Sequence, residues 1–349
     1  MNEARVNDFV HKALGDVGSA LTASLVVIGD RLGLYRAMAD GRPTTPTELA
    51  QRTGTTERSV REWLAAQAAA GYVEYDATTQ RYSLPPEHAV ALVQEDSPAF
   101  VAGAFQAMTA AMRAEPKVRE AFRSGCGLGW HEHDPELFHG VERFFRPGYN
   151  ANLVNEWIPA LDGVKKKLER GAVVADVGCG YGASTIILAK AFPRSTFIGF
   201  DYHKASIDSA QQRVAQENLG DRARFEVANA KSYPGSYDLV VSMDCLHDMG
   251  DPVGAATHVK ESLKPGGTWM LVEPFAGDKV EDNLNPVGRL FYSVSTLVCT
   301  QASLAQEVGT ALGAQAGEAR LREVAIRAGF TRFRRATQTP FNLVFEVRP

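Results

Sequence analysis

The residues with the clearest chemical role are alternating glycines that follow a short apolar run. The run 173–177 leads into Gly178, Gly180 and Gly182, and an apolar helical pattern starts at Ala183. Glycine has no Cβ, so the backbone can adopt positive φ there and approach a ligand closely at a helix amino terminus. We therefore predict a strand, a nucleotide-binding turn and a helix. The spacing Gly178-x-Gly180-x-x-Ala183 also fits the loose dinucleotide-binding fingerprint, so the turn alone does not identify the nucleotide.

Two carboxylates accompany this turn. Asp201 ends the next predicted strand roughly 20 residues after the glycines, where a carboxylate can accept hydrogen bonds from both ribose hydroxyls. Asp176 lies inside the apolar run before the turn, and a buried carboxylate needs a hydrogen-bonding or cationic partner. We expect Asp201 to bind ribose and Asp176 to belong to the same site.

A histidine follows another predicted strand. His247 comes shortly after the apolar run 237–243. Ligands of open α/β sheets bind at the carboxyl ends of the strands, so this position favours a functional role over packing. An imidazole with an ordinary pKa near 6.5 can accept a proton at neutral pH. We therefore consider His247 a candidate general base, with helix capping or lining of the cofactor site as open alternatives.

These residues resemble the class I S-adenosylmethionine-dependent methyltransferases, whose first motif is an acidic residue, a spacer and alternating glycines. Asp176 and the three glycines match that motif in full. The resemblance implies S-adenosylmethionine as the cofactor, with the glycine turn at its methionine end, Asp201 at its ribose and Asn229-Ala230 near its adenine. The predicted cofactor-binding residues are Asp176, Gly178, Gly180, Gly182, Asp201, Asn229, Ala230 and Met243.

The resemblance also implies the catalytic residues. His247-Asp248 is similar to the His-Asp pair of small-molecule O-methyltransferases from plants and bacteria, in which the histidine takes the proton of the acceptor hydroxyl. Glu273, at the end of the fifth predicted strand, matches an acid that supports this histidine. Met249 stands where that group usually has tryptophan. The resemblance thus implies a catalytic pair of His247 and Glu273.

Methyl transfer from a sulfonium is an in-line displacement. A protein can catalyse it largely by holding the nucleophile and the methyl carbon aligned in a dry site. The reaction requires no metal, and we predict no metal site. A general base adds about 10²–10⁴-fold when the nucleophile is a hydroxyl. We expect O-methylation of a small aromatic or polycyclic hydroxyl compound.

After residue 170, strand and helix patterns alternate, as in a parallel sheet covered by helices on both faces. We predict strands at 173–177, 196–200, 224–228, 238–243 and 268–273. Helices are predicted at 183–191, 204–217 and 253–263, with a tight turn at 264–267. A helical insertion at 286–311, a helix at 318–328 and a strand pair near 333 and 341–347 follow. The predicted fold is α/β, a Rossmann-like methyltransferase sheet that is mostly parallel with an antiparallel carboxyl-terminal strand.

A long helix is predicted to open the chain. Its apolar face is formed by residues at helical spacing, namely Leu14, Val17, Leu21, Leu25, Ile28, Leu32 and Tyr35. The stripe belongs either to the core of one chain or to an interface between subunits.

A winged helix is predicted next. Thr45, Pro46 and Glu48 occupy the N-cap, first-turn and capping-box positions of a helix that ends near Gly54. A second helix at 57–70 and short strands at 72–75 and 81–84 complete it. DNA contacts would have to come from Arg52, Arg58 and Arg61.

The charge of this region argues against DNA binding. Residues 1–95 carry nine Lys and Arg against twelve Asp and Glu. Binding a polyanion usually needs a basic footprint, so we favour a dimerisation and substrate-capping module.

The segment 97–170 is predicted to be helical, with a glycine-rich break at 125–129 and a turn at 146–148. Aromatic residues gather in it: Trp130, Phe138, Phe144, Phe145, Tyr149 and Trp157. Such residues pack a core or cap a pocket. The predicted substrate contacts are Trp130, Tyr149, Phe291 and Tyr292.

Composition limits the class of protein. The chain has 349 residues, 45% hydrophobic and 22% charged, and a net charge of −4. That length predicts more than one domain, and we divide the chain into 1–95, 96–170 and 171–349. The cysteines lack the paired spacing of a zinc or redox motif. No signal peptide is apparent and no apolar run looks long enough to span a bilayer, so we expect a cytoplasmic protein.

A winged helix, a helical connector and a methyltransferase domain together resemble bacterial winged-helix methyltransferases. The resemblance covers almost the whole chain and implies a homodimer formed through the amino-terminal helices.

Three alternatives stay open. They are an S-adenosylmethionine-binding winged-helix transcription regulator, an NAD-dependent oxidoreductase, which only Ala183 supports, and a methyltransferase fold used for other chemistry.

Overall fold

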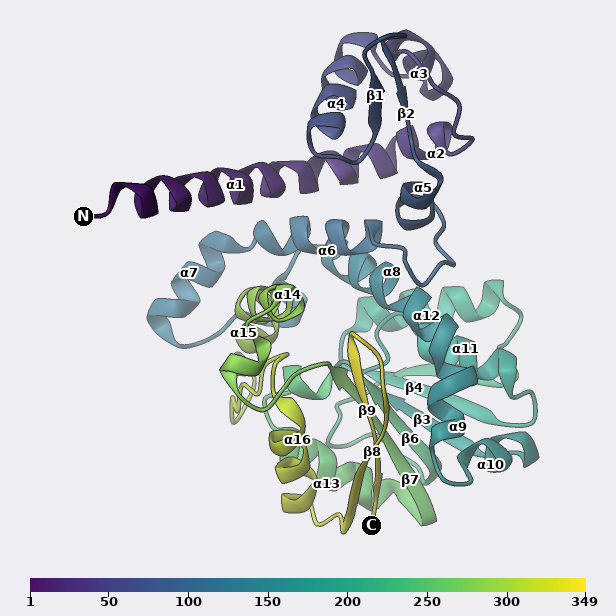
Figure 1. Ribbon diagram of the computed structural model, residues 1–349. Coiled ribbons are helices and arrows are strands. Elements are labelled where there is room, and N and C mark those ends of the chain that lie inside the picture. Colours follow the sequence, from purple (N-terminus) through teal and green to yellow (C-terminus); the bar gives the residue numbers. More distant parts are fainter. The chain divides into compact units, whose positions relative to one another are not determined.

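The chain forms two compact units in a computed structural model that describes residues 1–349; its elements are labelled in Figure 1. The first unit consists of Met1–Thr109 and His139–Pro147, and the second of Ala110–Phe138 and Gly148–Pro349. Helix α8 (Pro135–Asn152) therefore contributes residues to both units. The three-part division at residues 95 and 170 remains a prediction.

The first unit is a winged helix preceded by a long helix. Its two strands pair antiparallel, with Tyr75 opposite Tyr82. Its elements are α1 (Glu3–Arg31), α2 (Leu34–Met38), α3 (Pro46–Thr53), α4 (Glu57–Ala69), β1 (Glu74–Asp76), β2 (Arg81–Ser83), α5 (Pro86–Leu92) and most of α6 (Ala102–Met112).

Local sequence determines where α3 begins and ends. The Thr45 hydroxyl accepts the Glu48 N–H at 3.3 Å, and the Glu48 carboxylate accepts the Thr45 N–H at 2.9 Å. Both halves of the predicted capping box are therefore formed. Gly54, with φ of 64°, ends the helix. Thr56, the N-cap of α4, makes no such side-chain bond.

The core of the first unit is built around Tyr35 and Trp63. Their ring centroids lie 5.0 Å apart. The indole N–H of Trp63 donates to the Leu25 carbonyl at 2.9 Å, and the Tyr35 hydroxyl donates to Gln67 at 2.5 Å. A Cβ at Gly29 would lie only 2.5 Å from the Trp63 ring, so glycine permits this close packing.

The opening helix differs from the prediction in length and packing. α1 ends at Arg31, and Tyr35 lies on α2, so the apolar stripe does not continue on one helix to Tyr35. Leu14, Val17 and Leu21 are 63%, 58% and 67% exposed. This part of the stripe is therefore not in the core of the chain.

Helix α1 is, by length and composition, apolar enough to cross a membrane. This corrects the prediction that no apolar run is long enough, because few charged residues interrupt the helix. Core helices of soluble proteins and amino-terminal signal sequences pass the same test, so the match is weak support for a membrane span.

A seven-stranded sheet is the centre of the second unit. Its strand order is β5-β4-β3-β6-β7-β9-β8. The strands β3 to β7 pair in parallel, whereas β9 is antiparallel to both β7 and β8. The predicted sheet is thus confirmed. The strands are β3 (Val173–Val177), β4 (Thr196–Asp201), β5 (Ala223–Val227), β6 (Tyr237–Met243), β7 (Leu263–Pro274), β8 (Arg332–Gln338) and β9 (Asn342–Arg348).

Helices cover both faces of this sheet. Figure 1 shows α11 and α12 on one side of the sheet and α13 and α16 on the other. The helices and turns of this unit, besides part of α8, are α7 (Glu115–Ser124), η1 (Trp130–Glu132), η2 (Leu153–Trp157), α9 (Ile158–Ala160), α10 (Val164–Arg170), α11 (Ala183–Ala191), α12 (Lys204–Gln216), η3 (Leu246–Asp248), α13 (Pro252–Ser262), η4 (Val280–Asn283), α14 (Pro286–Val294), η5 (Ser295–Cys299), α15 (Thr300–Leu304) and α16 (Gly317–Arg327).

Two predicted turns are wrong. The segment 146–148 is not a turn, because α8 continues through Pro147. A proline removes one hydrogen bond from a helix. The ion pair between Arg146 and Glu142, one turn earlier at 2.9 Å, joins the turns of α8 next to this proline. The segment 264–267 lies within β7, where pairing with β6 shifts between Leu263 and Thr268. Its glycines therefore form an irregularity within the strand.

Candidate functional site

The three glycines after β3 have different roles. Gly178, Gly180 and Gly182 all have positive φ, at 78°, 50° and 76°. A Cβ on Gly178 would lie 2.7 Å from the Cys245 sulfur, and one on Gly182 would lie 2.4 Å from the Phe225 ring. A Cβ on Gly180 would meet nothing within 4 Å. Gly178 and Gly182 therefore permit internal packing, whereas Gly180 leaves open space for a ligand to approach.

Asp201, at the end of β4, is joined to this turn. One of its carboxylate oxygens accepts the Gly180 N–H at 3.0 Å, and the other accepts the His203 N–H at 2.8 Å. Burial raises the pKa of Asp201 above its usual range, against the effect of these two backbone bonds. The structure thus brings the predicted ribose ligand directly to the glycine turn.

Asp176 has the hydrogen-bonding partners that its burial requires. Its Oδ2 accepts the hydroxyls of Ser184 and Thr185, at 2.5 and 2.7 Å. Both hydroxyls come from the first turn of α11. Burial raises the pKa of Asp176 to about 6. Its Oδ1 is buried and has no hydrogen-bond partner, so one acceptor remains unused beside the turn.

A second buried carboxylate lies directly after β6. Asp244 accepts the Tyr149 hydroxyl at 2.8 Å and the Asn342 side-chain amide at 2.9 Å. Its φ is +52°, a conformation that non-glycine residues rarely adopt and that often marks a functional site. Burial, followed by the charge of Glu273, raises the pKa of Asp244 to about 7. Asp244 is not among the predicted site residues, although its place after a parallel strand could have indicated it.

His247 and Glu273 form a buried pair, in agreement with their predicted partnership. The imidazole Nδ1 lies 2.5 Å from a carboxylate oxygen of Glu273. The other Glu273 oxygen accepts the Leu246 N–H at 2.9 Å, which fixes the carboxylate. The pair joins η3 to the end of β7.

Asp248 faces the other side of the imidazole. Its Oδ1 lies 3.1 Å from Nε2 of His247. Burial opposes the charged imidazole, but the carboxylates of Asp248 and Glu273 outweigh it and raise the pKa of His247 well above its ordinary value.

Cys299 is a further residue near this histidine that the sequence did not indicate. One ligand atom from each of His247, Asp248 and Cys299 lies within 4.8 Å of the others. Burial, together with the charge of Asp248, raises the pKa of the Cys299 thiol to about 12. The three residues come from η3 and η5, which are far apart in the sequence, so spacing along the chain gave no signal.

The remaining predicted cofactor residues lie at strand ends. Asn229 is exposed after β5 and accepts the Lys231 N–H at 2.9 Å, and Ala230 is partly buried. Met243 is buried as the last residue of β6. The structure places them at the same edge of the sheet as Asp201, because the carboxyl ends of parallel strands share one edge.

The predicted substrate residues fall into separate places. Tyr149 reaches Asp244, as described above, and Phe291 packs in a small apolar cluster with Cys299. The Trp130 and Phe138 rings are tilted against each other with centroids 5.0 Å apart, and the Phe138 centroid lies 4.7 Å from that of His203. Tyr292 is partly buried on α14.

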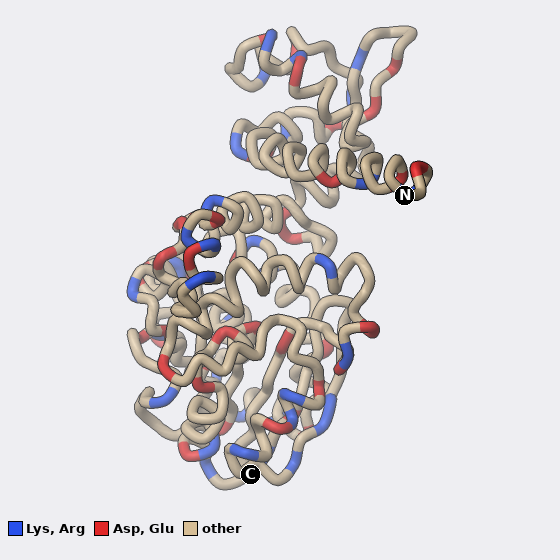
Figure 2. The backbone as a smooth tube through the Cα atoms, turned by 90° about the vertical axis from the view of Figure 1, so that its left-hand side faces the viewer, with Lys and Arg blue, Asp and Glu red and all other residues tan.

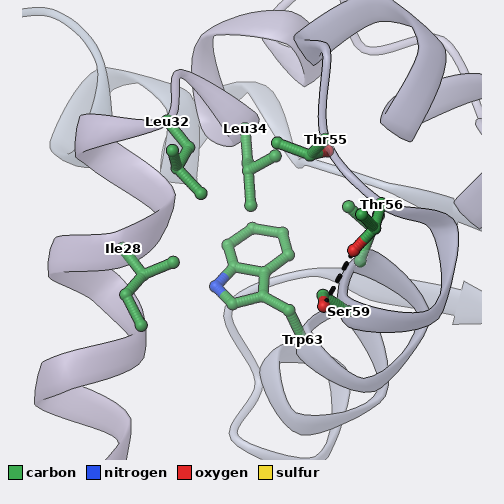
Figure 3. Close-up of a pocket in the computed structure, with 8 residues that line it drawn as sticks. Ile28, Leu32, Leu34, Thr55, Thr56, Ser59 and Trp63 are labelled. Atoms are coloured by element: carbon green, nitrogen blue, oxygen red, sulfur yellow. Dashed lines mark hydrogen bonds between the residues drawn. The ribbon is translucent and has the colours of Figure 1, made fainter.

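A cavity of about 270 Å³ lies in the first unit, and its lining residues are far in the sequence from the predicted cofactor and substrate residues. Figure 3 shows the ring of Trp63 between Ile28 and Leu32 on one side and Thr56 and Ser59 on the other. It is mostly apolar and has none of the acidic groups described above, so we do not assign it to the chemistry of the second unit.

Two family models match the chain. A model described as an Rv2258c-like winged HTH domain matches residues 20–94, and a methyltransferase domain matches residues 168–324. The chain therefore contains an amino-terminal winged helix followed by a methyltransferase domain, which confirms the predicted order.

Curated relatives match parts of the chain. It is 31% identical over 130 residues to a demethylmenaquinone methyltransferase of Lactiplantibacillus plantarum, covering 36% of this chain and 54% of that protein. It is 28% identical over 177 residues to a ubiquinone biosynthesis O-methyltransferase of Psychrobacter arcticus, covering 46% and 64%. The chain thus spans less than two thirds of the length of these relatives.

Solved structures match over the full length. The mitomycin 7-O-methyltransferase MmcR aligns over 100% of both chains, with a TM-score of 0.73 and 19% identity. PigF, solved with SAH, aligns over 97% of this chain and 99% of its own, with a TM-score of 0.75 and 17% identity. At these identities the similarity establishes the fold, a Rossmann-like sheet with a helical amino-terminal part.

Proposed function

We propose that this chain, which joins a winged helix to an S-adenosylmethionine-dependent methyltransferase domain, transfers a methyl group from S-adenosylmethionine to a hydroxyl group of a small molecule. The observation that carries the proposal is the buried pair of His247 and Glu273 at the sheet edge that also holds the glycine turn. Relatives and structural neighbours named as O-methyltransferases support the reaction class.

The residues around the turn fit the cofactor. Gly180 has open space above it, and Asp176 has an unused acceptor beside it. The Asp201 carboxylate accepts the Gly180 N–H at the turn, which supports assigning it to the ribose hydroxyls. We assign Asn229, Ala230 and Met243 to the adenosine end on the strength of the resemblance. When bound, S-adenosylmethionine supplies an electrophilic methyl group on a positively charged sulfur.

His247 is proposed as the general base. Because Glu273 engages Nδ1, Nε2, which faces Asp248, is the ring atom that would accept the hydroxyl proton. Glu273 would then stabilise the charged imidazole without taking the proton itself. The ring accepts a proton only in its neutral form, and the carboxylates of Asp248 and Glu273 favour the charged form by raising its pKa.

The acceptor is proposed to lie among the aromatic residues of the second unit. Tyr149 contacts Asp244, and Phe291 packs with Cys299. The charge of Glu273 acts on Asp244, and that of His247 acts on Cys299. We also retain Trp130 and Tyr292 as candidates from the sequence. An aromatic or polycyclic hydroxyl compound suits such a lining.

The acceptor can be identified directly. The chain is incubated with isotopically labelled S-adenosylmethionine and a metabolite extract, and mass spectrometry searches for a product heavier by one labelled methyl group. We expect such a product with the wild-type chain and a much slower reaction with His247→Ala, although S-adenosylhomocysteine should bind both equally. A His247→Ala variant that turns over normally would remove the general-base role.

We further propose that the chain is a homodimer formed through α1. The exposed apolar stripe on α1 supports this assembly, and its later residues Ile28 and Leu32 line the cavity in Figure 3. A cytoplasmic location is consistent with this reading of α1 as an interface helix.

Binding to nucleic acid is the second candidate function, because the winged helix belongs to a type that includes DNA-binding domains. Charge does not favour it. Arg58 pairs with Glu62 at 2.5 Å and Arg61 with Glu57 at 2.7 Å, and Figure 2 shows basic and acidic residues intermixed along the chain. A DNA shift assay over a salt series tests the regulator alternative. Specific binding of DNA by the wild-type chain that is lost in Arg58→Ala and Arg61→Ala would support it.

A further inference from the structure

We propose that His247, Asp248 and Cys299 form a binding site for a borderline-soft divalent cation, best matched by Zn²⁺. One ligand atom from each residue lies within 4.8 Å of the other two. Tetrahedral zinc with imidazole, carboxylate and thiolate ligands places those atoms roughly 3.3–3.8 Å apart. Side-chain movements of about 1 Å would therefore bring them into coordination distance.

The imidazole, the carboxylate and the thiol lie close enough together to share one ion. Glu273 holds Nδ1 of His247, so in a neutral ring Nε2 carries the lone pair. Nε2 lies 3.1 Å from Oδ1 of Asp248, yet that buried oxygen accepts no hydrogen bond. Two lone-pair atoms in this position require a positive charge between them, which either a proton or a metal ion can supply.

The surroundings have the features of a metal centre. A carboxylate on the second ring nitrogen, as Glu273 provides, is the usual partner of a metal-binding histidine. Thiolate and carboxylate together balance the two charges of the ion. Cys299 ends the π-helical turn η5, and such turns are frequent at functional sites.

A further buried histidine belongs to the same unit. His133 is only 5% exposed, and neither of its ring nitrogens has a hydrogen-bond partner. Burial lowers the pKa of His133 and so favours its neutral form, which is the form that binds metals.

Metal binding would compete with the proton on His247. The ion displaces the thiol proton of Cys299 and any proton on Nε2, so the apparent affinity should rise with pH. With Nε2 coordinated, the ring could not accept a proton from a substrate. The site is therefore inhibitory if the proposed general-base mechanism holds, but binding itself does not depend on that mechanism.

Cobalt titration of the full chain tests the proposal. The purified, metal-free protein is titrated with Co²⁺, and the absorption spectrum is recorded without cofactor or acceptor. We expect one Co²⁺ per chain, a thiolate-to-cobalt charge-transfer band, and displacement by Zn²⁺. Since removal of a second-shell partner alone costs about 10–100-fold in affinity, Cys299→Ser should abolish the band and weaken binding at least about 100-fold.

Two further variants keep the test decisive. Cys126→Ser removes the exposed thiol and should leave the charge-transfer band intact. Asp248→Asn keeps the side-chain shape and should weaken Co²⁺ binding at least about 10-fold, even if Cys299→Ser fails to fold. The proposal is overturned if wild-type protein binds no Co²⁺, or if its band persists in Cys299→Ser. Failure here would leave methyl transfer untouched, because no turnover is measured.

Discussion

A histidine held between two carboxylates does different chemistry from a free one. Glu273 and Asp248 lie on opposite sides of the His247 ring, at 2.5 and 3.1 Å. Their charges stabilise the imidazolium more than burial destabilises it, so its pKa is raised. A base of this kind becomes active as the pH rises through its raised pKa.

The first prediction concerns the pH dependence of methyl transfer. Asp248→Asn removes one of the charges that favour the imidazolium, so the pKa of His247 should fall. Transfer requires the neutral ring, and the rising limb of the pH–rate profile should therefore move to lower pH, by about one unit or more. Rates are measured from pH 5 to 10, about the range over which His and its neighbours titrate, with a chelator present. A profile that stays in place would show that Asp248 does not act on the base.

The second prediction concerns Asp201. A hydrogen bond to a charged group contributes about 1.5–3 kcal/mol, so Asp201→Ala should weaken binding of S-adenosylhomocysteine by roughly 10–100-fold. Calorimetry measures the dissociation constant. Asp208→Ala is the matched control, because Asp208 is an acid on the following helix that pairs only with Lys204 at 2.7 Å. Equal affinity in wild type and Asp201→Ala would exclude the ribose role.

The sequence was informative for residues whose role follows from position along one strand. Asp201 and His247 were selected because each stands at or after a strand end, and Asp176 because a buried carboxylate needs a partner. The structure joins Asp201 to the glycine turn and Asp176 to the first turn of α11. Cys299 and Asp244 could not be selected in this way. Their importance depends on contacts with residues about 50 to 100 positions away, which periodicity cannot reveal.

Elements were predictable where local chemistry decides their ends. α11 spans the predicted residues, and α3 begins at the predicted N-cap and ends at the predicted glycine. Prediction failed where tertiary context decides, as at Pro147 inside α8 and at the irregularity in β7. A proline or a glycine pair is a local signal for a turn, but packing and strand pairing can override it.

The third prediction compares two N-caps in the winged helix. The Thr45 hydroxyl caps α3, whereas the Thr56 hydroxyl makes no cap bond at α4. Replacing a bonded N-cap by alanine costs about 1 kcal/mol, so Thr45→Ala should lower the free energy of unfolding by that amount and Thr56→Ala by clearly less. Urea unfolding followed by circular dichroism gives both values. Equal losses would mean that the capping box does not stabilise α3.

At the scale of the whole molecule, packing within one chain does not explain the exposed apolar residues of α1. Leu14, Val17 and Leu21 form a stripe that faces solvent. A soluble protein rarely exposes a continuous apolar stripe unless a partner covers it. The sequence identified the stripe by its spacing, but it could not decide between core and interface, because both bury one face of a helix.

The fourth prediction tests what covers this stripe. Leu14→Glu combined with Leu21→Glu should convert a dimer into a monomer. Burying one leucine contributes about 1.5–3 kcal/mol, and both subunits lose two, so the dissociation constant should rise at least about 100-fold. Ser19→Glu is the control, because Ser19 is exposed away from the stripe and should leave the dimer intact. Light scattering during gel filtration, over a range of concentrations, gives the mass. A wild-type chain that is monomeric at high concentration, or that sediments with lipid vesicles through α1, would replace the dimer by a free or membrane-bound helix.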